Sequence, residues 1–287
     1  MKPSTRLKTI LAARSAAILP GTPNALFARL IAQHGFEATY VTGAGIANMS
    51  YGFPDIGLVT LAELCGHVAA IADAVELPIL VDADTGFGNP LNVIRTVRLL
   101  ERAGAAGIQL EDQVFPKKCG HFAGKQVIAR TAMVQKIKAA CDARHDGDLQ
   151  IVARTDALAI EGIDAAIDRA QAYVEAGADA TFVEAPVETA ELARIARELP
   201  VPQIANMVFG GLTPPASRDE LSALGFGGVL YANAALQAAL KSVREVLGSL
   251  KHNGSLDAVR DRLASFEERQ RAVAKDHYDA LEARYRD

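Results

Sequence analysis

The chain has 287 residues, which is enough for one large α/β domain or two small ones. Half of the residues are hydrophobic, and the formal net charge is −4 without a block of like charge, so nucleic acid is not an expected partner. The three Cys residues have no paired spacing and no apolar stretch could span a membrane, which argues against a disulfide framework, a zinc site or a membrane anchor and favours a cytoplasmic protein.

Short apolar runs that end in small or acidic residues alternate with helical patterns. The expected strands are 16–19, 38–42, 79–82, 107–111, 150–154, 180–184, 203–206 and 228–231. The clearest helical patterns are 61–75, 92–103, 131–143, 163–176 and 189–198, and Gly104, Gly177 and Gly225 mark helix ends. This alternation predicts parallel βαβ units, and a count near eight favours a closed α/β (β/α)8 TIM-type barrel over an open doubly wound sheet.

The last part of the chain, 236–287, has no strand pattern and predicts two helices, 236–250 and 256–285. This is more helix than the final turn of a barrel needs, so we expect a C-terminal helical extension that packs on a neighbouring subunit. The alternative is a helix folded back on its own barrel. No linker of Pro, Gly and Ser separates the extension, which predicts a single domain over 1–287.

Many of the predicted strands end in polar residues: Thr42, Asp82 with Asp84, Glu111 with Asp112, Arg154, Glu184 and Asn206. In a parallel barrel the reactive groups lie at the carboxyl ends of the strands. Carboxylates crowded at one mouth repel and raise each other's pKa, and a bound divalent cation would resolve the conflict.

Oxygen ligands without a His at the strand ends indicate Mg²⁺, or alternatively Mn²⁺, rather than zinc. Because Mg²⁺ keeps several waters, we expect Asp82 as the direct ligand, with Asp84 and Glu111 holding metal-bound waters. The alternative for Asp84 or Glu111 is a carboxylate that caps a helix or a loop.

Two Lys, a Cys and a His lie within five residues, as Lys117, Lys118, Cys119, Gly120 and His121. Neighbouring cations favour the thiolate, so the pKa of Cys119 should be lowered, and such a thiol can donate and accept a proton near neutral pH. The alternative is a solvated basic loop with an incidental Cys.

Two further groups suit carboxylate binding. The backbone N–H groups of the segment that begins at Gly43 and Ala44 could cradle an oxygen, as Gly-rich turns do. Arg154 suits a bidentate grip on a carboxylate. The alternative for Arg154 is a structural pair with Glu184.

Seven motifs together resemble the isocitrate lyase/phosphoenolpyruvate mutase superfamily over nearly the whole chain. They are the segments 40–45, 51–55, 81–88, 109–113, 117–121, 153–157 and 206–207. The Lys-Lys-Cys-Gly-His run is similar to that of the lyase branch, which includes 2-methylisocitrate lyase, 2,3-dimethylmalate lyase and related oxaloacetate hydrolases. The resemblance implies a magnesium-dependent barrel, a mobile loop around Cys119, and a homotetramer (a dimer of dimers) whose C-terminal helices swap between subunits.

The resemblance also implies a reaction: cleavage of a C–C bond in a 2-hydroxy di- or tricarboxylate, giving a 2-oxo acid such as pyruvate and a carboxylic acid. Cys119 would protonate the carbon of the departing fragment, in a loop that Lys117 and Lys118 help to form and that His121 and Glu184 orient. The residues that would hold the small-molecule substrate are Thr42, Gly43, Ala44, Asp55, Arg154 and Asn206. Tyr40 and a metal-bound water are the alternatives for the base.

The chain departs from the methylisocitrate lyase pattern after its last strand, where Ala232 replaces a Pro and Gln237 replaces an Arg. A third substrate carboxylate therefore lacks a partner, which favours a C4–C6 dicarboxylate such as a 2-alkylmalate. Ala232 and Asn233 stand where oxaloacetate hydrolases carry a Ser, which disfavours oxaloacetate hydrolysis without removing it. The alternatives are an oxaloacetate hydrolase or decarboxylase, a carboxyphosphonoenolpyruvate- or phosphonopyruvate-type enzyme, and a non-catalytic binding protein.

Overall fold

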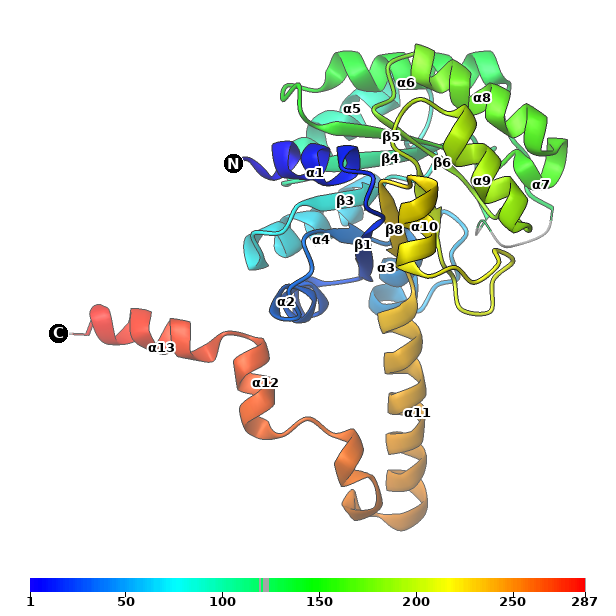
Figure 1. Cartoon of the computed structure of the whole chain (residues 1–287). Coiled ribbons are helices and arrows are strands. Elements are labelled where there is room, and N and C mark those ends of the chain that lie inside the picture. Colours follow the sequence, from blue (N-terminus) through cyan, green and yellow to red (C-terminus); the bar gives the residue numbers. More distant parts are fainter. Residues whose placement is uncertain (119, 121–123, 287) are drawn as a thin grey trace.

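Eight parallel strands form a nearly closed barrel in a computed structural model, which describes residues 1–118, 120 and 124–286 (Figure 1). The strands are β1 (Ala17–Thr22), β2 (Thr39–Val41), β3 (Ile79–Asp82), β4 (Gly107–Glu111), β5 (Gln150–Thr155), β6 (Ala180–Val183), β7 (Ile204–Asn206) and β8 (Gly228–Tyr231). Neighbouring strands pair in the order β6-β5-β4-β3-β2-β1-β8-β7. A parallel bridge between Thr181 and Gln203 brings β6 beside β7, and the Thr181 hydroxyl donates to Gln203 Oε1 (2.7 Å). The predicted TIM-type barrel is confirmed.

The strand predictions are confirmed in position, and those for β3, β4 and β8 coincide at both ends. β1 continues to Thr22, beyond the predicted end at 19. Pro20 and Gly21 belong to the strand, because Pro20 pairs with Tyr231 and Gly21 with Tyr40 in the parallel ladders. Gly21 is required there because a Cβ atom would overlap the Ala232 backbone.

The helices between the strands cover the outside of the barrel. They are α2 (Ala25–Gln33), α3 (Gly43–Tyr51), α4 (Leu61–Ala74), α5 (Pro90–Arg102), α6 (Arg130–Ala143), α7 (Leu158–Glu161), α8 (Ile163–Glu175), α9 (Thr189–Glu198) and α10 (Arg218–Leu224). Capping boxes start several of them, such as Thr60 with Glu63 at α4. Gly104, Gly177 and Gly225 have φ of 104°, 109° and 89°, so the predicted glycine helix ends are confirmed.

An N-terminal helix, α1 (Pro3–Ala12), packs against the barrel through Leu7 and Leu11, which are fully buried. Its polar side is tied to the segment before β5, where Ser4 donates to Asp146 (2.8 Å) and Thr5 to Asp148 (2.7 Å). The sequence indicated only an amphipathic segment here. Helix α1 therefore helps to cover the barrel interior, although the strands that it contacts lie far from it in the sequence.

The C-terminal extension begins with α11 (Ala234–Asn253), which projects from the barrel (Figure 1). The single helix predicted over 256–285 is wrong. It is divided into η1 (Asp257–Arg262), α12 (Phe266–Ala272) and α13 (Lys275–Arg284), because Ser265 and Glu268 form a capping box that starts a new helix. None of these four elements has a buried residue. Among the described residues, no helix combines the length and hydropathy needed to cross a bilayer.

Candidate active site

The carboxyl ends of the strands surround a cavity of 180 Å³. This is the end at which parallel barrels place reactive groups. The cavity brings together most of the residues that the sequence singled out: Tyr40, Thr42, Ala44, Asp55, Asp82, Lys117, Lys118, Arg154, Glu184 and Asn206. Gly43 and Asp84 line an adjoining hollow with Asp55 and Asp82.

Asp82, the last residue of β3, directs its two carboxylate oxygens to different surroundings. Oδ1 accepts hydrogen bonds from the Asp84 main-chain N–H (3.1 Å) and from Gln109 Nε2 (3.3 Å). Oδ2 faces Gly43, where a Cβ atom would lie 3.4 Å from it and 3.5 Å from Asp84 Oδ1. One oxygen of each carboxylate therefore borders the same small space beside Gly43.

Asp84 lies just past the strand in the left-handed region, with a φ of 47°. Burial is the largest influence on its carboxyl group and raises its pKa to about 6, against the opposing attraction of the Lys117 ammonium. The negative charge of Asp82 adds to the rise. The crowding of carboxylates that the sequence predicted is thus reflected in this pKa.

Lys117 places its ammonium among these carboxylates. Its Nζ lies 2.8 Å from Asp84 Oδ1 and is also paired with Asp55, and the side chain is 4% exposed. Although burial acts to lower it, the carboxylates of Asp84 and Asp55 raise the pKa of Lys117 well above its usual range. The charge of Lys117, which the sequence associated with the thiol of Cys119, is paired with the acidic cluster.

Glu111 ends β4 in a buried position, with Oε2 3.4 Å from Arg154 Nη1. Burial raises the pKa of Glu111 well above its usual range, although Arg154 opposes the rise. Its other oxygen, Oε1, is buried and accepts no hydrogen bond from the described part of the chain. An acceptor of this kind needs a partner such as a water or a ligand.

The Arg154 guanidinium contacts three carboxylates, those of Glu111, Asp156 and Glu184. Its Nε and Nη2 donate to the two oxygens of Asp156 (2.9 and 3.1 Å), and Nη2 lies 3.2 Å from Glu184 Oε2. The guanidinium also lies 5.2 Å from the centre of the Phe182 ring. The pairing with Glu184 that the sequence left open is present, and the same side chain lines the cavity.

Tyr40 on β2 donates its hydroxyl hydrogen bond to Gln109 Oε1 (3.1 Å) and is 3% exposed. Burial first, and then the negative charge of Asp82, raises the pKa of Tyr40 well above its usual range. A phenol in these surroundings holds its proton at neutral pH, which weighs against Tyr40 as the base.

The sequence suggested a Gly-rich turn from Gly43 to Gly45, but this segment is the first turn of helix α3. Thr42 is the N-cap, and its hydroxyl accepts from the Gly45 N–H (3.2 Å). The remaining N–H groups of a first turn have no partner within the helix, so those of Gly43 and Ala44 can bind an anion. We therefore still expect these backbone N–H groups to bind an anion, but because they belong to a helix N-terminus and not to a Gly-rich turn.

The basic run reaches the cavity through Lys117, Lys118 and Gly120. Lys118 is fixed by its main-chain N–H, which donates to Gln113 Oε1 (2.9 Å), and by its Nζ, which donates to Gly124 O (2.9 Å). A Cβ atom on Gly120 would overlap Arg154 Nη2 and the Glu184 side chain. The candidates Cys119 and His121 lie outside the described residues.

Three polar residues of the site were not singled out from the sequence. Gln109 joins Tyr40 to Asp82, Asp156 binds Arg154, and Lys125 donates to Asp156 Oδ1 (2.9 Å). Gln109 lies on β4 two residues before Glu111, and Asp156 directly follows β5 two residues after Arg154, so each points to the same side as that neighbour. This alternation was the available signal for both, whereas Lys125 offered none.

The model of the phosphoenolpyruvate phosphomutase family matches residues 7–251. The chain is 43% identical over 268 residues to 2,3-dimethylmalate lyase of Eubacterium barkeri, covering 93% of both chains. It is 45% identical over 262 residues to 2-methylisocitrate lyase of Aeropyrum pernix, covering 91% of this chain and 84% of the relative. The chain therefore belongs to the phosphoenolpyruvate phosphomutase family.

Solved structures show the same relationship. A crystal structure of 2,3-dimethylmalate lyase, described as a PEP mutase/isocitrate lyase superfamily member, matches with a TM-score of 0.93 at 32% identity and covers 99% of this chain and 95% of the other. A phosphonopyruvate hydrolase in complex with oxalate and Mg²⁺ matches with a TM-score of 0.88 at 32% identity and covers 99% of both chains. The resemblance found in the sequence is confirmed.

Proposed function

We propose that this protein is a magnesium-dependent C–C lyase that cleaves a 2-hydroxy dicarboxylate to a 2-oxo acid and a carboxylic acid. The observation that carries the proposal is that the acidic cluster of Asp82 and Asp84, the buried Arg154 and Gly120 line one cavity and its adjoining hollow. The lyase activity of relatives at 43% and 45% identity supports it.

The donor set suits Mg²⁺ held mainly through water. Asp82 Oδ2 and Asp84 Oδ1 border the same space, and the buried Oε1 of Glu111 accepts no hydrogen bond from the described residues. No group of three His, Cys, Asp or Glu side chains in the described part of the chain could enclose a metal by itself. Magnesium needs only one or two carboxylates, so Asp82 would bind it and Asp84 and Glu111 would hold its waters; Mn²⁺ is the alternative.

The bound cation would supply Lewis acidity for the 2-hydroxy acid and its 2-oxo product. The Mg²⁺ and oxalate in the related phosphonopyruvate hydrolase structure support this choice of metal, because oxalate resembles the carboxylate and adjoining oxygen of a 2-oxo acid.

Positive charge and backbone donors on the other walls suit the substrate carboxylates. Arg154, Asn206 and the first N–H groups of α3, at Gly43 and Ala44, face the cavity or its adjoining hollow. Thr42 fixes that helix end, and Asp55 fixes Lys117. Together these groups would hold a dianion with its hydroxyl toward the acidic cluster.

Cleavage would begin with transfer of the hydroxyl proton to a base, for which Tyr40 and a bound water are the alternatives, and the alkoxide would then collapse to a ketone. The C–C bond breaks, and its electron pair moves to the departing fragment as an enediolate. Cys119 would then donate a proton to that carbon, with His121 and Glu184 orienting the thiol and Lys117 and Lys118 supplying positive charge nearby. Gly120, between Cys119 and His121 in the sequence, packs on Arg154 and Glu184.

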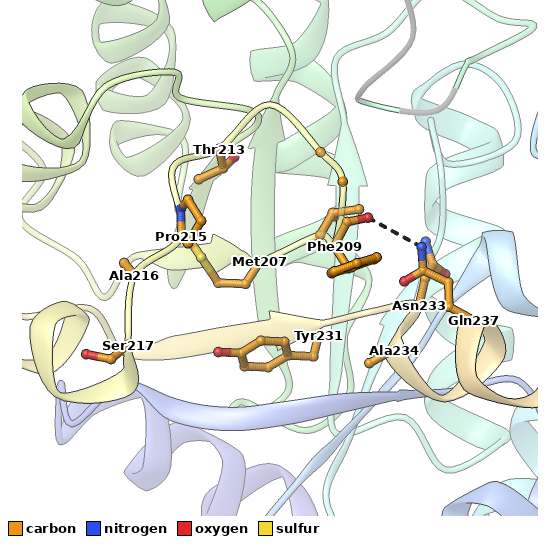
Figure 2. A pocket seen from close by; sticks show the side chains of 13 residues that line it. Met207, Phe209, Thr213, Pro215, Ala216, Ser217, Tyr231, Asn233, Ala234 and Gln237 are labelled. Atoms are coloured by element: carbon orange, nitrogen blue, oxygen red, sulfur yellow. Dashed lines mark hydrogen bonds between the residues drawn. The ribbon is translucent and has the colours of Figure 1, made fainter. Parts of the chain in front are cut away.

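The substrate would carry two carboxylates, as in a 2-alkylmalate or 2,3-dimethylmalate. Arg154 is the one arginine among the described residues that line the 180 Å³ cavity. Gln237 occupies the position at which methylisocitrate lyases carry an Arg, and its amide donates to Phe209 O (3.4 Å) (Figure 2). A tricarboxylate such as 2-methylisocitrate would therefore be a poorer substrate.

Hydrolysis on the same scaffold is the second candidate. The relationship to phosphonopyruvate hydrolase favours it, because that enzyme shares the fold over 99% of this chain. An oxaloacetate hydrolase or decarboxylase belongs to the same alternative.

The deciding experiment follows 2-oxo acid release by coupled reduction with NADH, with magnesium and a panel of 2-alkylmalates, 2,3-dimethylmalate, 2-methylisocitrate, phosphonopyruvate and oxaloacetate. Formation of the corresponding 2-oxo acid from a 2-alkylmalate (pyruvate where the alkyl group is methyl), abolished in Cys119→Ser, is the expected result. Loss of oxaloacetate or phosphonopyruvate without cleavage of any hydroxy acid would sink the lyase proposal.

The helical extension supports a homotetramer, a dimer of dimers in which C-terminal helices exchange between subunits. Leu240, Val243, Leu247 and Leu250 form an exposed stripe along α11. A 620 Å³ hollow lined by Met207, Tyr231 and Ala234 lies at the base of that helix (Figure 2). The stripe would pack on a second copy of the chain.

Cytoplasmic localisation is likewise proposed, because the spacing of the three Cys residues does not suggest disulfide pairs.

A further inference from the structure

Lys125 is a charged residue that the fold buries, with 8% of its surface exposed. Its ammonium has two partners from different parts of the chain. It donates to Asp156 Oδ1 (2.9 Å) and to the main-chain carbonyl of Gly120. A buried ammonium is costly unless it is paired, so this arrangement fixes three segments to one another.

Asp156 is fully buried and anchored independently of Lys125. Its main-chain N–H donates to Asp112 Oδ1 (2.9 Å), and its carboxylate accepts from Arg154 Nε (2.9 Å) and Nη2 (3.1 Å). Although burial acts to raise it, the positive charges of Arg154 and Lys125 lower the pKa of Asp156. Asp156 is therefore a fixed anion that both cations share.

The binding of Asp156 to the Nε–Nη2 edge determines which edge of the Arg154 fork faces the cavity. The Nη1–Nη2 end lies toward Glu111 (3.4 Å) and Glu184 (3.2 Å). A substrate carboxylate in the cavity would approach this end, so a small rotation of the fork would misplace it.

Gly120 lies directly on this guanidinium. A Cβ atom at Gly120 would overlap Arg154 Nη2 and the carboxylate end of Glu184, so the Gly120 backbone and the fork are in van der Waals contact. The Gly120 carbonyl is the second acceptor of Lys125. Lys125 Nζ thus connects Gly120, on one side of that contact, to Asp156, which binds Arg154 on the other side.

We propose that Lys125 is a positioning residue of the active site: by bridging the Gly120 carbonyl and the Asp156 carboxylate, it holds the Gly120 backbone against Arg154 and sets the orientation of the fork. An ammonium suits this task because it offers three donors from one point. The kinetic part of this inference rests on the proposed function, since it concerns the grip on a substrate carboxylate.

A purely structural role is the competing explanation, in which Lys125 only neutralises Asp156. It predicts a lower melting temperature for a Lys125 variant with unchanged kinetics of the folded protein. A positioning role predicts altered kinetics of the folded protein and easier opening at Gly120, in addition to the loss of stability that breaking a buried ion pair causes.

The test compares Lys125→Met with Lys138→Met, an exposed lysine of α6, in the full-length protein with magnesium. For the 2-alkylmalate that the wild type cleaves fastest, Lys125→Met should lower kcat/KM by about 100-fold through both a raised KM and a lowered kcat. Ethylammonium should restore part of the activity of Lys125→Ala. Wild-type kinetics in Lys125→Met, or no effect of ethylammonium on Lys125→Ala, would overturn the proposal.

A second readout does not depend on turnover. Trypsin cleavage after Lys118 in the native protein is followed by mass spectrometry. The rate should rise about tenfold in Lys125→Met and stay unchanged in Lys138→Met. The reason is that local opening at Gly120 becomes easier once its carbonyl loses the hydrogen bond from Lys125. Equal cleavage rates would overturn the proposal. If Lys125→Met does not fold, Lys125→Gln takes its place under the same criteria. A wild type that cleaves no hydroxy acid contradicts the proposed function, and the trypsin rates then decide the role of Lys125.

Discussion

Lys117 Nζ lies 2.8 Å from Asp84 Oδ1, so an ammonium directly faces the acidic cluster at the mouth of the barrel. This pair shows how the fold tolerates neighbouring carboxylates. Lys117 opposes the rise in the pKa of Asp84 without cancelling it. The acidic cluster therefore remains short of positive charge, which is the condition that favours a divalent cation.

The first prediction concerns pH. The pKa of Asp84 is raised from 3.8 to about 6 in the folded protein, so the native state binds this proton more tightly than the unfolded state. Without metal, stability from this group is complete below pH 3.8 and is lost as the pH rises through 6, a change on the order of 3 kcal/mol. Melting temperatures in EDTA from pH 3.8 to pH 7 should show the loss, and Asp84→Asn should reduce it relative to the exposed control Asp261→Asn. An unchanged slope in Asp84→Asn would contradict the assignment.

The second prediction concerns the metal. Mg²⁺ with oxalate should raise the melting temperature of the wild type, by about 5 °C at 100 times the dissociation constant. Asp82→Asn should abolish this shift because the proposed direct ligand is lost, while its melting temperature without metal stays close to that of the wild type. The exposed Asp261→Asn serves as control. A full shift in Asp82→Asn would exclude Asp82 as the metal ligand.

Parallel-barrel geometry explains why so much of the site could be predicted. Once the strand ends at Asp82, Glu111 and Arg154 are recognised, the fold brings their side chains to one mouth without further information. Every residue of β3 and β4 is buried and each strand ends at an acidic residue, Asp82 or Glu111, so their bounds were predicted correctly.

Side-chain pairing across distant segments could not be predicted in the same way. The contact of Lys125 with Asp156 joins residues 31 positions apart, and it depends on which long side chain packs inward. The break in the C-terminal extension was missed because its helical composition outweighed the weak capping signal of Ser265. Secondary-structure patterns determine elements, whereas these features depend on tertiary contacts.

The third prediction concerns the contact between Gly120 and Arg154. Gly120→Ala should lower kcat/KM by about 100-fold, because a methyl group would displace a fork that Asp156 holds in place. Gly66→Ala is the matched control, since a Cβ atom on that α4 residue meets nothing within 4 Å. Circular dichroism should show both variants folded. Wild-type kinetics in Gly120→Ala would show that the fork can move aside without cost to the reaction.

The fourth prediction concerns assembly. Leu247→Glu places a charge in the exposed apolar stripe of α11 and should dissociate the proposed tetramer, because burying an unpaired carboxylate costs more than the leucine contributes, about 1.5–3 kcal/mol. Leu91→Glu alters a more exposed leucine on α5 and should leave the assembly intact. Sedimentation velocity measures both masses. The same mass for Leu247→Glu and the wild type would show that the stripe lies outside the interface.

The fifth prediction concerns substrate choice. Gln237 donates to Phe209 O at the edge of the hollow beside the cavity, and it offers no charge to a third carboxylate. Gln237→Arg should raise kcat/KM for 2-methylisocitrate relative to a 2-alkylmalate by about tenfold, since a charge-assisted hydrogen bond contributes roughly 1.5 kcal/mol or more. Gln237→Met removes the amide without adding charge and should leave this ratio unchanged. Coupled assays with both substrates give the ratio directly, and an equal change in the Arg and Met variants would mean that position 237 acts through the Phe209 loop and not by binding a carboxylate.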